Sequence, residues 1–286
     1  MRRLDVFVIQ RVLQTAFFSN SFQWIILSNV GNLPFQSCVV IHVKLAKYNL
    51  PGTFTARTFT LPSRFKKNQV LQRHVSFSFS APYYTLNNVT PATKYIWVVC
   101  HGYAQLAEFF VQKFDFLDPG KHFVIAPQGL SRLYLDQTYG RVGASWMTKE
   151  DRETELANQR AYFDAVFDPI FEDIDFDHYK LILFGFSQGV SAVARLAAHK
   201  KWPFHKMVLW AGGFPKELTP ADFEFASPKA EVIGCIGRQD IYYSEQLLAQ
   251  EKVRLKELFG KNTRSLVFEG KHEVNREELM RLASKF

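Results

Sequence analysis

The stretch Leu181-Ile182-Leu183-Phe184-Gly185-Phe186-Ser187-Gln188-Gly189 decides how the rest of the sequence is interpreted. An apolar run of strand length leads into Gly-x-Ser-x-Gly, and residues 190–199 then have helical spacing. A buried strand, a tight turn that carries a serine and a following helix are together typical of a nucleophile elbow. A side chain at either glycine would collide with the neighbouring strand or helix. The pattern predicts Ser187 as a nucleophile at a helix N-terminus, and a glycine-rich turn with a capping serine is the alternative.

Other apolar runs of strand length alternate with segments of helical character. The expected strands are residues 75–79, 95–100, 123–126, 181–184, 207–210, 232–236 and 266–268. The expected helices are one that opens at a capping box over residues 148–151 and runs towards Phe167, and those at residues 190–199, 247–259 and 273–282. Strands that alternate with helices predict an α/β domain, with a mostly parallel, doubly wound sheet and helices on both of its faces.

The positive charge of the chain is confined to its N-terminal part. The 286 residues carry a formal net charge of +8, yet residues 1–74 balance to +9 and residues 75–286 to −1. We therefore expect a basic N-terminal extension, not an independent domain, followed by one domain over residues 75–286. A neutral main body argues against nucleic acid as a partner. The basic, acid-poor start resembles an organellar transit peptide, and translated upstream sequence is the alternative.

Composition excludes several further classes of protein. Apolar residues make up 47% and charged residues 22%, so the chain can bury a sizeable core. No apolar run approaches the roughly 20 residues that cross a bilayer, which argues against integral membrane association. Cys38, Cys100 and Cys235 are scattered without zinc-like spacing. They favour a reducing compartment such as the cytoplasm over a disulfide scaffold or a metal site.

A serine nucleophile needs a base, and the base needs an acid that fixes its tautomer. In folds that carry a nucleophile elbow, the acid and then the histidine follow later strands. Asp240 lies in the loop after the expected strand at residues 232–236, and His272 follows the strand at residues 266–268. We therefore predict Asp240 as the acid and His272 as the base.

Other acids and histidines fit these positions less well. Asp222 and Glu245 remain alternatives for the acid, although one lies in a Pro-rich loop and the other at an expected helix start. His101 follows a strand, but that strand precedes the nucleophile, which is the wrong chain order for the base. The remaining rivals lie before strands, at a strand start or at a helix end: His122, His178, His199 and His205.

The oxyanion of an acyl-transfer intermediate needs two backbone N–H donors. One belongs to the residue after the nucleophile, which is Gln188, and the other to a loop after an early strand. The loop at residues 101–105 (His-Gly-Tyr-Ala-Gln) is suitably placed, with the N–H of Tyr103 as the donor. Gly102 would let its backbone approach the substrate carbonyl closely.

Taken together, these segments resemble a known family. The small phospholipase/carboxylesterase family of α/β-hydrolases, which includes acyl-protein thioesterases, has similar motifs at residues 101–105, 185–189, 211–215, 240 and 270–272. The resemblance covers residues 75–286. It implies an α/β-hydrolase fold, a triad of Ser187, Asp240 and His272, and an oxyanion hole formed by Tyr103 and Gln188.

The chain departs from the family pattern at two glycine positions. Val190 follows Ser-Gln-Gly where the family usually has a second glycine, and Ala104 stands where another glycine is usual. These changes affect the expected shape of the acyl pocket. Trp146 lies in a segment that is similar to a Ser-Trp segment of the family whose aromatic lies near the substrate, and core packing is the alternative role.

The combined interpretation is a serine hydrolase. We expect it to cleave carboxylic esters of small or medium acyl groups through a Ser-His-Asp triad and an acyl-enzyme intermediate, without a metal or organic cofactor. The partner would be a small-molecule ester or an acylated substrate. An acyl-protein thioesterase or lysophospholipase activity, or a non-catalytic binding protein with this fold, are the alternatives.

Overall fold

The computed structural model describes residues 27–28, 40–41, 70–137, 139–242 and 244–285. The chain divides into two compact units, Met1–Phe77 and Ser78–Phe286. In the first unit, β1 (Leu27–Ser28) pairs antiparallel with β2 (Val40–Ile41). The other described helices and strands belong to the second unit.

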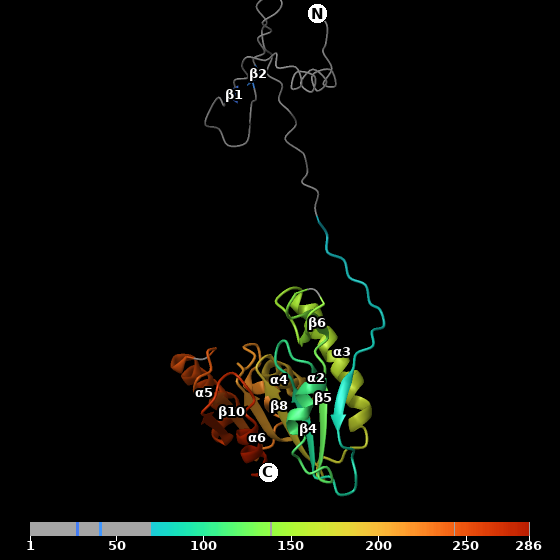
Figure 1. Ribbon diagram of the computed structural model, residues 1–286, viewed down its shortest axis with the longest axis vertical. Helices are drawn as coiled ribbons and strands as arrows, with labels where there is room; N and C mark the ends of the chain where they lie inside the picture. The colour runs from blue at the N-terminus through green and yellow to red at the C-terminus, as the bar shows by residue number, and fades with distance from the viewer. Residues whose placement is uncertain (1–26, 29–39, 42–69, 138, 243, 286) are drawn as a thin grey trace, which may run out of the picture. The chain divides into compact units, whose positions relative to one another are not determined.

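A seven-stranded sheet forms the centre of the second unit (Figure 1). Its strands are β3 (Tyr83–Leu86), β4 (Tyr95–Cys100), β5 (His122–Pro127), β8 (Lys180–Phe186), β9 (Phe204–Trp210), β10 (Glu231–Gly237) and β11 (Thr263–Phe268). Their order across the sheet is β11-β10-β9-β8-β4-β5-β3, and every neighbouring pair is parallel except β3 with β5. The predicted mostly parallel sheet is therefore confirmed.

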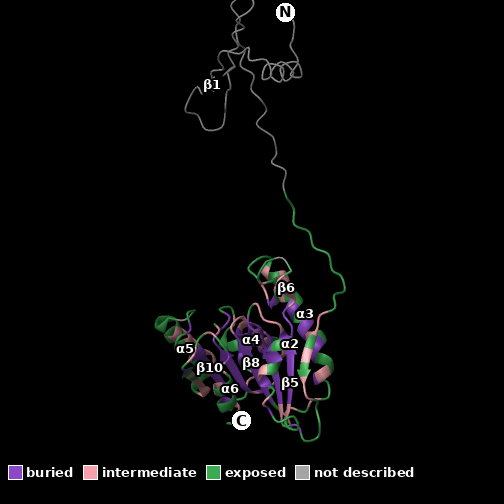
Figure 2. Ribbon diagram, viewed as in Figure 1, coloured by how far each residue is buried: buried purple, intermediate pink, exposed green. Residues whose placement is uncertain are grey.

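Helices cover both faces of this sheet, as the sequence predicts. The helices are α2 (Ala107–Val111), α3 (Arg152–Phe171), α4 (Gln188–Lys200), α5 (Glu245–Phe259) and α6 (Arg276–Ala283). On β4, Ile96 and Val98 pack into the apolar cluster that contains α3, α4 and Leu255 of α5. Trp97 and Val99, which point to the opposite face, join the cluster with α2 and α6. Figure 2 shows the consequence, a buried sheet between helices whose outer surfaces are exposed.

The strand predicted at residues 75–79 is wrong. These residues form no strand, and Val75 and Phe77 are 84% and 77% exposed. Their alternation of apolar residues with serine imitates a half-buried strand, but no sheet face receives the apolar side chains. The edge strand is β3 instead, which the sequence analysis missed because its antiparallel pairing with β5 is a long-range contact.

The capping box predicted at residues 148–151 is also wrong. Helix α3 begins at Arg152, and the residue before it, Asp151, has a φ of 46° and makes no side-chain cap hydrogen bond. Thr148 instead bonds the carboxylate of Glu155 through its backbone N–H and its hydroxyl. The acidic partner of Thr148 is thus seven residues away, whereas a capping box places it three residues away.

The chain winds in both directions from β4, which makes the end of this strand the natural place for a site. After β4 the chain forms β5 on one side, and it later returns to form β8 on the other. Cys100, at the end of β4, is in register with Gly185 of β8. The loops that follow β4 and β8 therefore lie together, and in open α/β sheets ligands bind at such a switch point.

None of the helices within the described ranges combines the length and the apolar character needed to span a membrane.

We expect a chain that begins at His74 to fold without residues 1–73. The sheet begins at β3, and just ahead of it the carbonyl of Pro82 accepts a hydrogen bond from the Tyr162 hydroxyl at 2.7 Å. The melting temperature of the chain that begins at His74 should lie within about 5 °C of that of the full chain. A loss of about 1 kcal/mol in the free energy of unfolding lowers the melting temperature of a domain of this size by only ~2–4 °C. A chain that begins at Thr90 lacks β3 and serves as the destabilised control. A loss of more than ~10 °C for the His74 chain would contradict the expectation.

Candidate active site

Ser187 lies in a strained turn between β8 and α4. Its φ of 52° and ψ of −119° are values that side-chain-bearing residues rarely adopt. The turn is possible because two glycines flank it. A Cβ on Gly185 would lie 2.5 Å from the carbonyl oxygen of Gly189, and a Cβ on Gly189 would lie 2.2 Å from that of Cys100. The local sequence therefore places the serine at the carboxyl end of β8 and at the N-terminus of α4, a 13-residue helix.

The structure brings Ser187, His272 and Asp240 together from three different loops. The Ser187 Oγ lies 2.9 Å from Nε2 of His272, and Nδ1 of His272 lies 2.7 Å from Oδ2 of Asp240. The Asp240 side chain is fully buried, and its Oδ1 accepts a hydrogen bond from the N–H of Tyr242 at 2.9 Å. Because a carboxylate only accepts hydrogen bonds, the imidazole must place a proton on Nδ1 and direct its other nitrogen at the serine.

The loops that carry Asp240 and His272 are held against each other by backbone contacts. A Cβ on Gly237 would lie 2.4 Å from the carbonyl oxygen of Gly270, so the two loops can approach only because this residue is glycine. The N–H of Gln239 donates to the carbonyl of Gly270 at 2.9 Å, and the indole N–H of Trp210 on β9 donates to the carbonyl of Glu273 at 2.8 Å. These contacts fix the separation of acid and base before any substrate arrives.

The two alternative acids have other positions in the fold. Asp222 forms a capping box with Thr219 at the start of the short helix η2 (Pro220–Phe223). Glu245 is the first residue of α5. Neither makes a hydrogen bond to a histidine within the described part of the chain.

The two residues that carry the candidate oxyanion donors line the same cavity as the serine. Tyr103, Ser187, Gln188 and His272 line a cavity of about 640 Å³. The backbone N–H groups of Tyr103 and Gln188 make no hydrogen bond to any other described residue. Both donors are therefore available to an oxygen atom in the cavity.

His101 orients the peptide that carries the Tyr103 N–H. Its Nδ1–H donates to the carbonyl of Gly102 at 2.7 Å, while Nε2 accepts from the N–H of Gly129 at 3.0 Å and from the Gln128 amide at 3.2 Å. Burial lowers the pKa of His101 to about 4, so the ring is neutral with its proton on Nδ1. The carbonyl of Gly102 and the N–H of Tyr103 belong to one planar peptide and point in opposite directions. Holding the carbonyl towards His101 therefore turns the N–H away from it.

The side chain of Gln188 ties the elbow to the segment that carries Trp146. Its amide donates to the carbonyl of Met147 at 2.8 Å, and its oxygen accepts from the N–H of Trp146 at 3.0 Å. The indole N–H of Trp146 donates in turn to the carbonyl of His101 at 2.7 Å. Trp146 is only 4% exposed and is not among the residues that line the cavity beside Ser187. Its observed contacts position the loop at residues 101–105, the candidate oxyanion loop, and contact with a substrate stays a prediction.

No protein-family model and no curated protein sequence matches this chain. Several solved structures, in contrast, match it. Acyl-protein thioesterase 2 from Zea mays matches with a TM-score of 0.54 at 18% identity, over 72% of this chain and 97% of that one. A carboxylesterase from Mesorhizobium loti matches with a TM-score of 0.53 at 16% identity, over 72% and 94% of the two chains. A phospholipase/carboxylesterase from Dyadobacter fermentans matches with a TM-score of 0.52 at 16% identity, over 73% and 97%. The chain has the α/β-hydrolase fold.

At these identities the likeness establishes the fold and not the reaction. The structural neighbours named above are an acyl-protein thioesterase and carboxylesterases with the hydrolase fold. The resemblance to the phospholipase/carboxylesterase family is therefore confirmed at the level of structure. Within the described residues, no group of three His, Cys, Asp or Glu side chains is arranged to hold a metal ion.

Sequence reasoning missed two glutamines that support the candidate oxyanion loop at residues 101–105. Gln105 accepts a hydrogen bond from the N–H of Gly102 at 2.8 Å, and Gln128 bonds both His101 and the N–H of Ala107. A usable signal was present, because Gln128 directly follows the buried strand β5 at the edge where sites form. Its partners are far away in sequence, however, and no local pattern names them.

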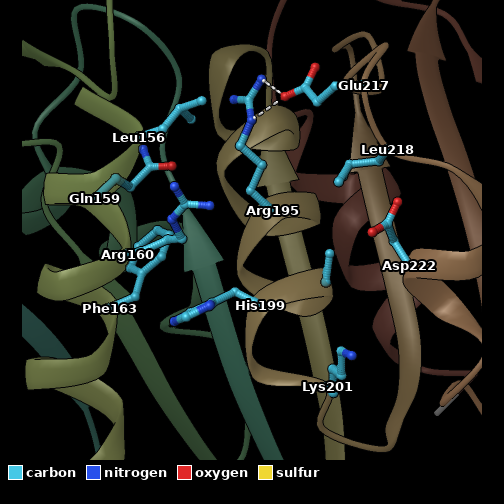
Figure 3. Close-up of a pocket in the computed structure, with 11 residues that line it drawn as sticks. Leu156, Gln159, Arg160, Phe163, Arg195, His199, Lys201, Glu217, Leu218 and Asp222 are labelled. Carbon is cyan, nitrogen blue, oxygen red and sulfur yellow. Dashed lines mark hydrogen bonds and ion pairs between the residues drawn. The ribbon is translucent and has the colours of Figure 1, made fainter. Parts of the chain in front are cut away.

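A second cavity, of about 360 Å³, lies between α3 and α4 and contains none of the three proposed triad residues (Figure 3). Arg195 crosses its upper end and forms an ion pair with Glu217 at 2.7 Å. Gln159, on the α3 side, donates to the carbonyl of Trp146 at 3.3 Å. This cavity therefore shares Gln159 with the hydrogen bonds that hold the segment of Trp146.

We expect Ala104→Gly to stabilise the protein by about 1 kcal/mol. Ala104 has a φ of 66°, a left-handed conformation in which a Cβ is crowded and glycine is not. Denaturation by urea would measure the change. Ala165→Gly is the matched control, because this exposed residue lies inside α3 and the same replacement should there destabilise by about 1 kcal/mol. A loss of stability in Ala104→Gly would show that this backbone is not strained.

The neutral, buried His101 predicts an acid-sensitive stability. Between its ordinary pKa of 6.5 and its lowered pKa of about 4, the unfolded chain binds a proton that the folded chain excludes. As the pH drops from 6.5 to about 4, protonation of His101 in the unfolded chain should therefore lower the free energy of unfolding by about 3 kcal/mol.

The measurement is urea denaturation of wild type and His101→Gln between pH 7 and 4.5. Gln retains a donor and an acceptor but does not titrate. Its stability should depend less steeply on pH than that of wild type, and parallel profiles would contradict the assignment.

Proposed function

We propose that the protein is a serine hydrolase of carboxylic esters, with Ser187 as the nucleophile. The observation that carries the proposal is the continuous chain of hydrogen bonds from Ser187 through His272 to Asp240, at an elbow that opens onto a cavity of about 640 Å³. Nucleophile, base and orienting acid at these distances form the arrangement that acyl-transfer enzymes use.

Each step of the reaction has a suitable group. Nε2 of His272 takes the proton from Ser187 as its Oγ attacks the acyl carbonyl, and Asp240 stabilises the imidazolium that results. The imidazolium then gives the proton to the leaving group, which departs and leaves an acyl-enzyme on Ser187. Water then attacks the acyl carbonyl while the same nitrogen takes its proton. The bond between the acyl carbon and Ser187 Oγ breaks, and the imidazolium returns the proton to Oγ, which releases the acid product and the free serine.

The negative charge of each tetrahedral intermediate would be met by two backbone donors. The N–H of Gln188 lies at the start of α4, where the helix dipole adds positive potential. The N–H of Tyr103 is oriented through the bond between His101 and Gly102. Donors that are fixed before the reaction cost little reorganisation when charge develops, and each is worth about 10²–10³-fold in kcat.

For the substrate we propose an oxygen ester of a small or medium acyl group, with a thioester as the alternative. The same relay serves both, and the names of the structural neighbours include a thioesterase and carboxylesterases. Rates on matched oxygen and sulfur esters with acyl chains of two to eight carbons, as a rough range, would rank these substrates. Since Cys100 and Cys235 are free, buried thiols, we further propose a reducing compartment such as the cytoplasm.

Ser187→Ala should abolish labelling by a fluorophosphonate probe and lower kcat on short p-nitrophenyl esters by at least about 10³-fold, because no other group would supply the nucleophile. The probe also separates an enzyme from a binding protein with the same fold, which would not react with it. Activity within tenfold of wild type would refute the assignment.

The acid is tested by a matched pair of substitutions as part of the same experiment. Asp240→Asn should lower kcat strongly, because it withdraws the charge that orients His272, whereas Asp222→Asn alters only a helix cap. His272→Ala combined with Ser187→Ala should be little worse than either alone, since the three residues act as a unit. The opposite ranking of the two Asn variants would move the acid to Asp222.

A further inference from the structure

We infer that the cavity beside Ser187 selects substrates that carry a positive charge, and that Glu251 provides this selectivity. The inference rests on the proposed function, since it concerns what that same site accepts. It starts from the charges of the cavity lining. Glu251 contributes a carboxylate to the wall, and no Lys or Arg is among the described residues that line it.

Glu251 has no cationic partner in the described part of the chain. It lies on α5, half-buried, and Oε2 accepts a hydrogen bond from the backbone N–H of Phe214 at 3.3 Å. Arg254, three residues further along the helix, is bonded to the carbonyls of Pro215 and Leu218 instead. These contacts thus leave part of the hydrogen-bonding capacity of the carboxylate for a group in the cavity.

Two tyrosines supply aromatic surface to the same cavity. Tyr103 and Tyr242 line it and are 54% and 66% exposed. The Tyr242 ring lies 4.6 Å from that of His272, nearly perpendicular to it, which places this aromatic beside the proposed base. Aromatic rings attract ammonium and guanidinium groups through their quadrupole, and they repel anions.

The two observations favour the same chemistry. A partly desolvated carboxylate and exposed tyrosine rings together form a site for an organic cation. A neutral apolar substrate would leave the carboxylate without a counter-charge, and an anionic one would be repelled by it. We therefore expect an ester or thioester with an ammonium or guanidinium group to be hydrolysed faster than an uncharged ester of the same shape.

A pair of thioesters of the same shape tests the inference directly. Acetylthiocholine and 3,3-dimethylbutyl thioacetate differ in that a positively charged nitrogen in one is a carbon in the other. Wild type should have a higher kcat/KM on the choline thioester, by about fivefold or more. Glu251→Gln, which keeps an oxygen that can accept from Phe214, should lower the ratio of the two kcat/KM values by about three- to tenfold.

Glu257→Gln is the matched control. Glu257 lies on the same helix, is exposed and does not line the cavity, so its replacement removes one charge without touching the site. It should leave the ratio unchanged. An equal fall in both variants would mean that the general field of α5 is responsible, and this would overturn the inference.

A measurement on wild type alone gives a second test that needs no variant to fold. Raising the salt concentration should lower the preference for the cationic thioester, because ions screen a partly exposed carboxylate. A preference that is absent, or indifferent to salt, overturns the inference and leaves the hydrolase proposal intact if both thioesters are cleaved. Failure to cleave either thioester, or p-nitrophenyl esters, would instead refute the hydrolase function, and the inference with it.

Discussion

The close approach of the elbow to the end of β4 is the constraint on which the site depends. Gly189 lies so near the carbonyl groups of Cys100 and His101 that a Cβ would come within 2.2 and 2.5 Å of their oxygens. This contact brings the turn of Ser187 beside the loop of Tyr103, although the two are more than 80 residues apart. It is possible because β4 and β8 are neighbours at the switch point of the sheet. A single methyl group at Gly189 would force the two loops apart.

Behind this contact lies a buried polar network that determines the direction of backbone donors. His101, Trp146 and Gln188 exchange hydrogen bonds with one another's main chain or with the loops between them. Buried polar groups destabilise a fold when they are unpaired, but a fully paired network has essentially one arrangement. The network thus holds the candidate oxyanion loop at residues 101–105 in one arrangement. Because it depends on a neutral His101, we expect that arrangement to be sensitive to acid.

The net charge of the whole chain and the charges that line the cavity favour different ligands. The net charge of +8 suggests an affinity for anions, but residues 75–286 together balance to −1. Among the described residues of that part, the cavity beside Ser187 has a negative group, Glu251, and no Lys or Arg in its wall. Local complementarity at a site follows from the few groups that face the ligand, so the overall isoelectric point is a poor guide to the substrate.

The sequence by itself determined most strands of the central sheet and pointed to the three proposed triad residues. Long apolar strands such as residues 95–100 and the Gly-x-Ser-x-Gly turn are local patterns, because burial on both faces and a tight turn each leave a signature in neighbouring residues. Chain order then pointed to Asp240 and His272. The same local reasoning failed at residues 75–79, where alternation occurs without a sheet face to receive it.

Only the tertiary structure decided which residues support and line the site. The bonds from His101 to Gly129 and from Trp146 to His101 join segments 28 and 45 residues apart, and nothing in either segment specifies the other. Glu251 reaches the cavity because α5 packs beside the loop of Phe214, which a helical pattern cannot reveal. Catalytic residue types are recognisable in sequence because chemistry restricts them to a few side chains at strand ends. Their supports are set by contacts between distant segments, which exist only once the chain has folded.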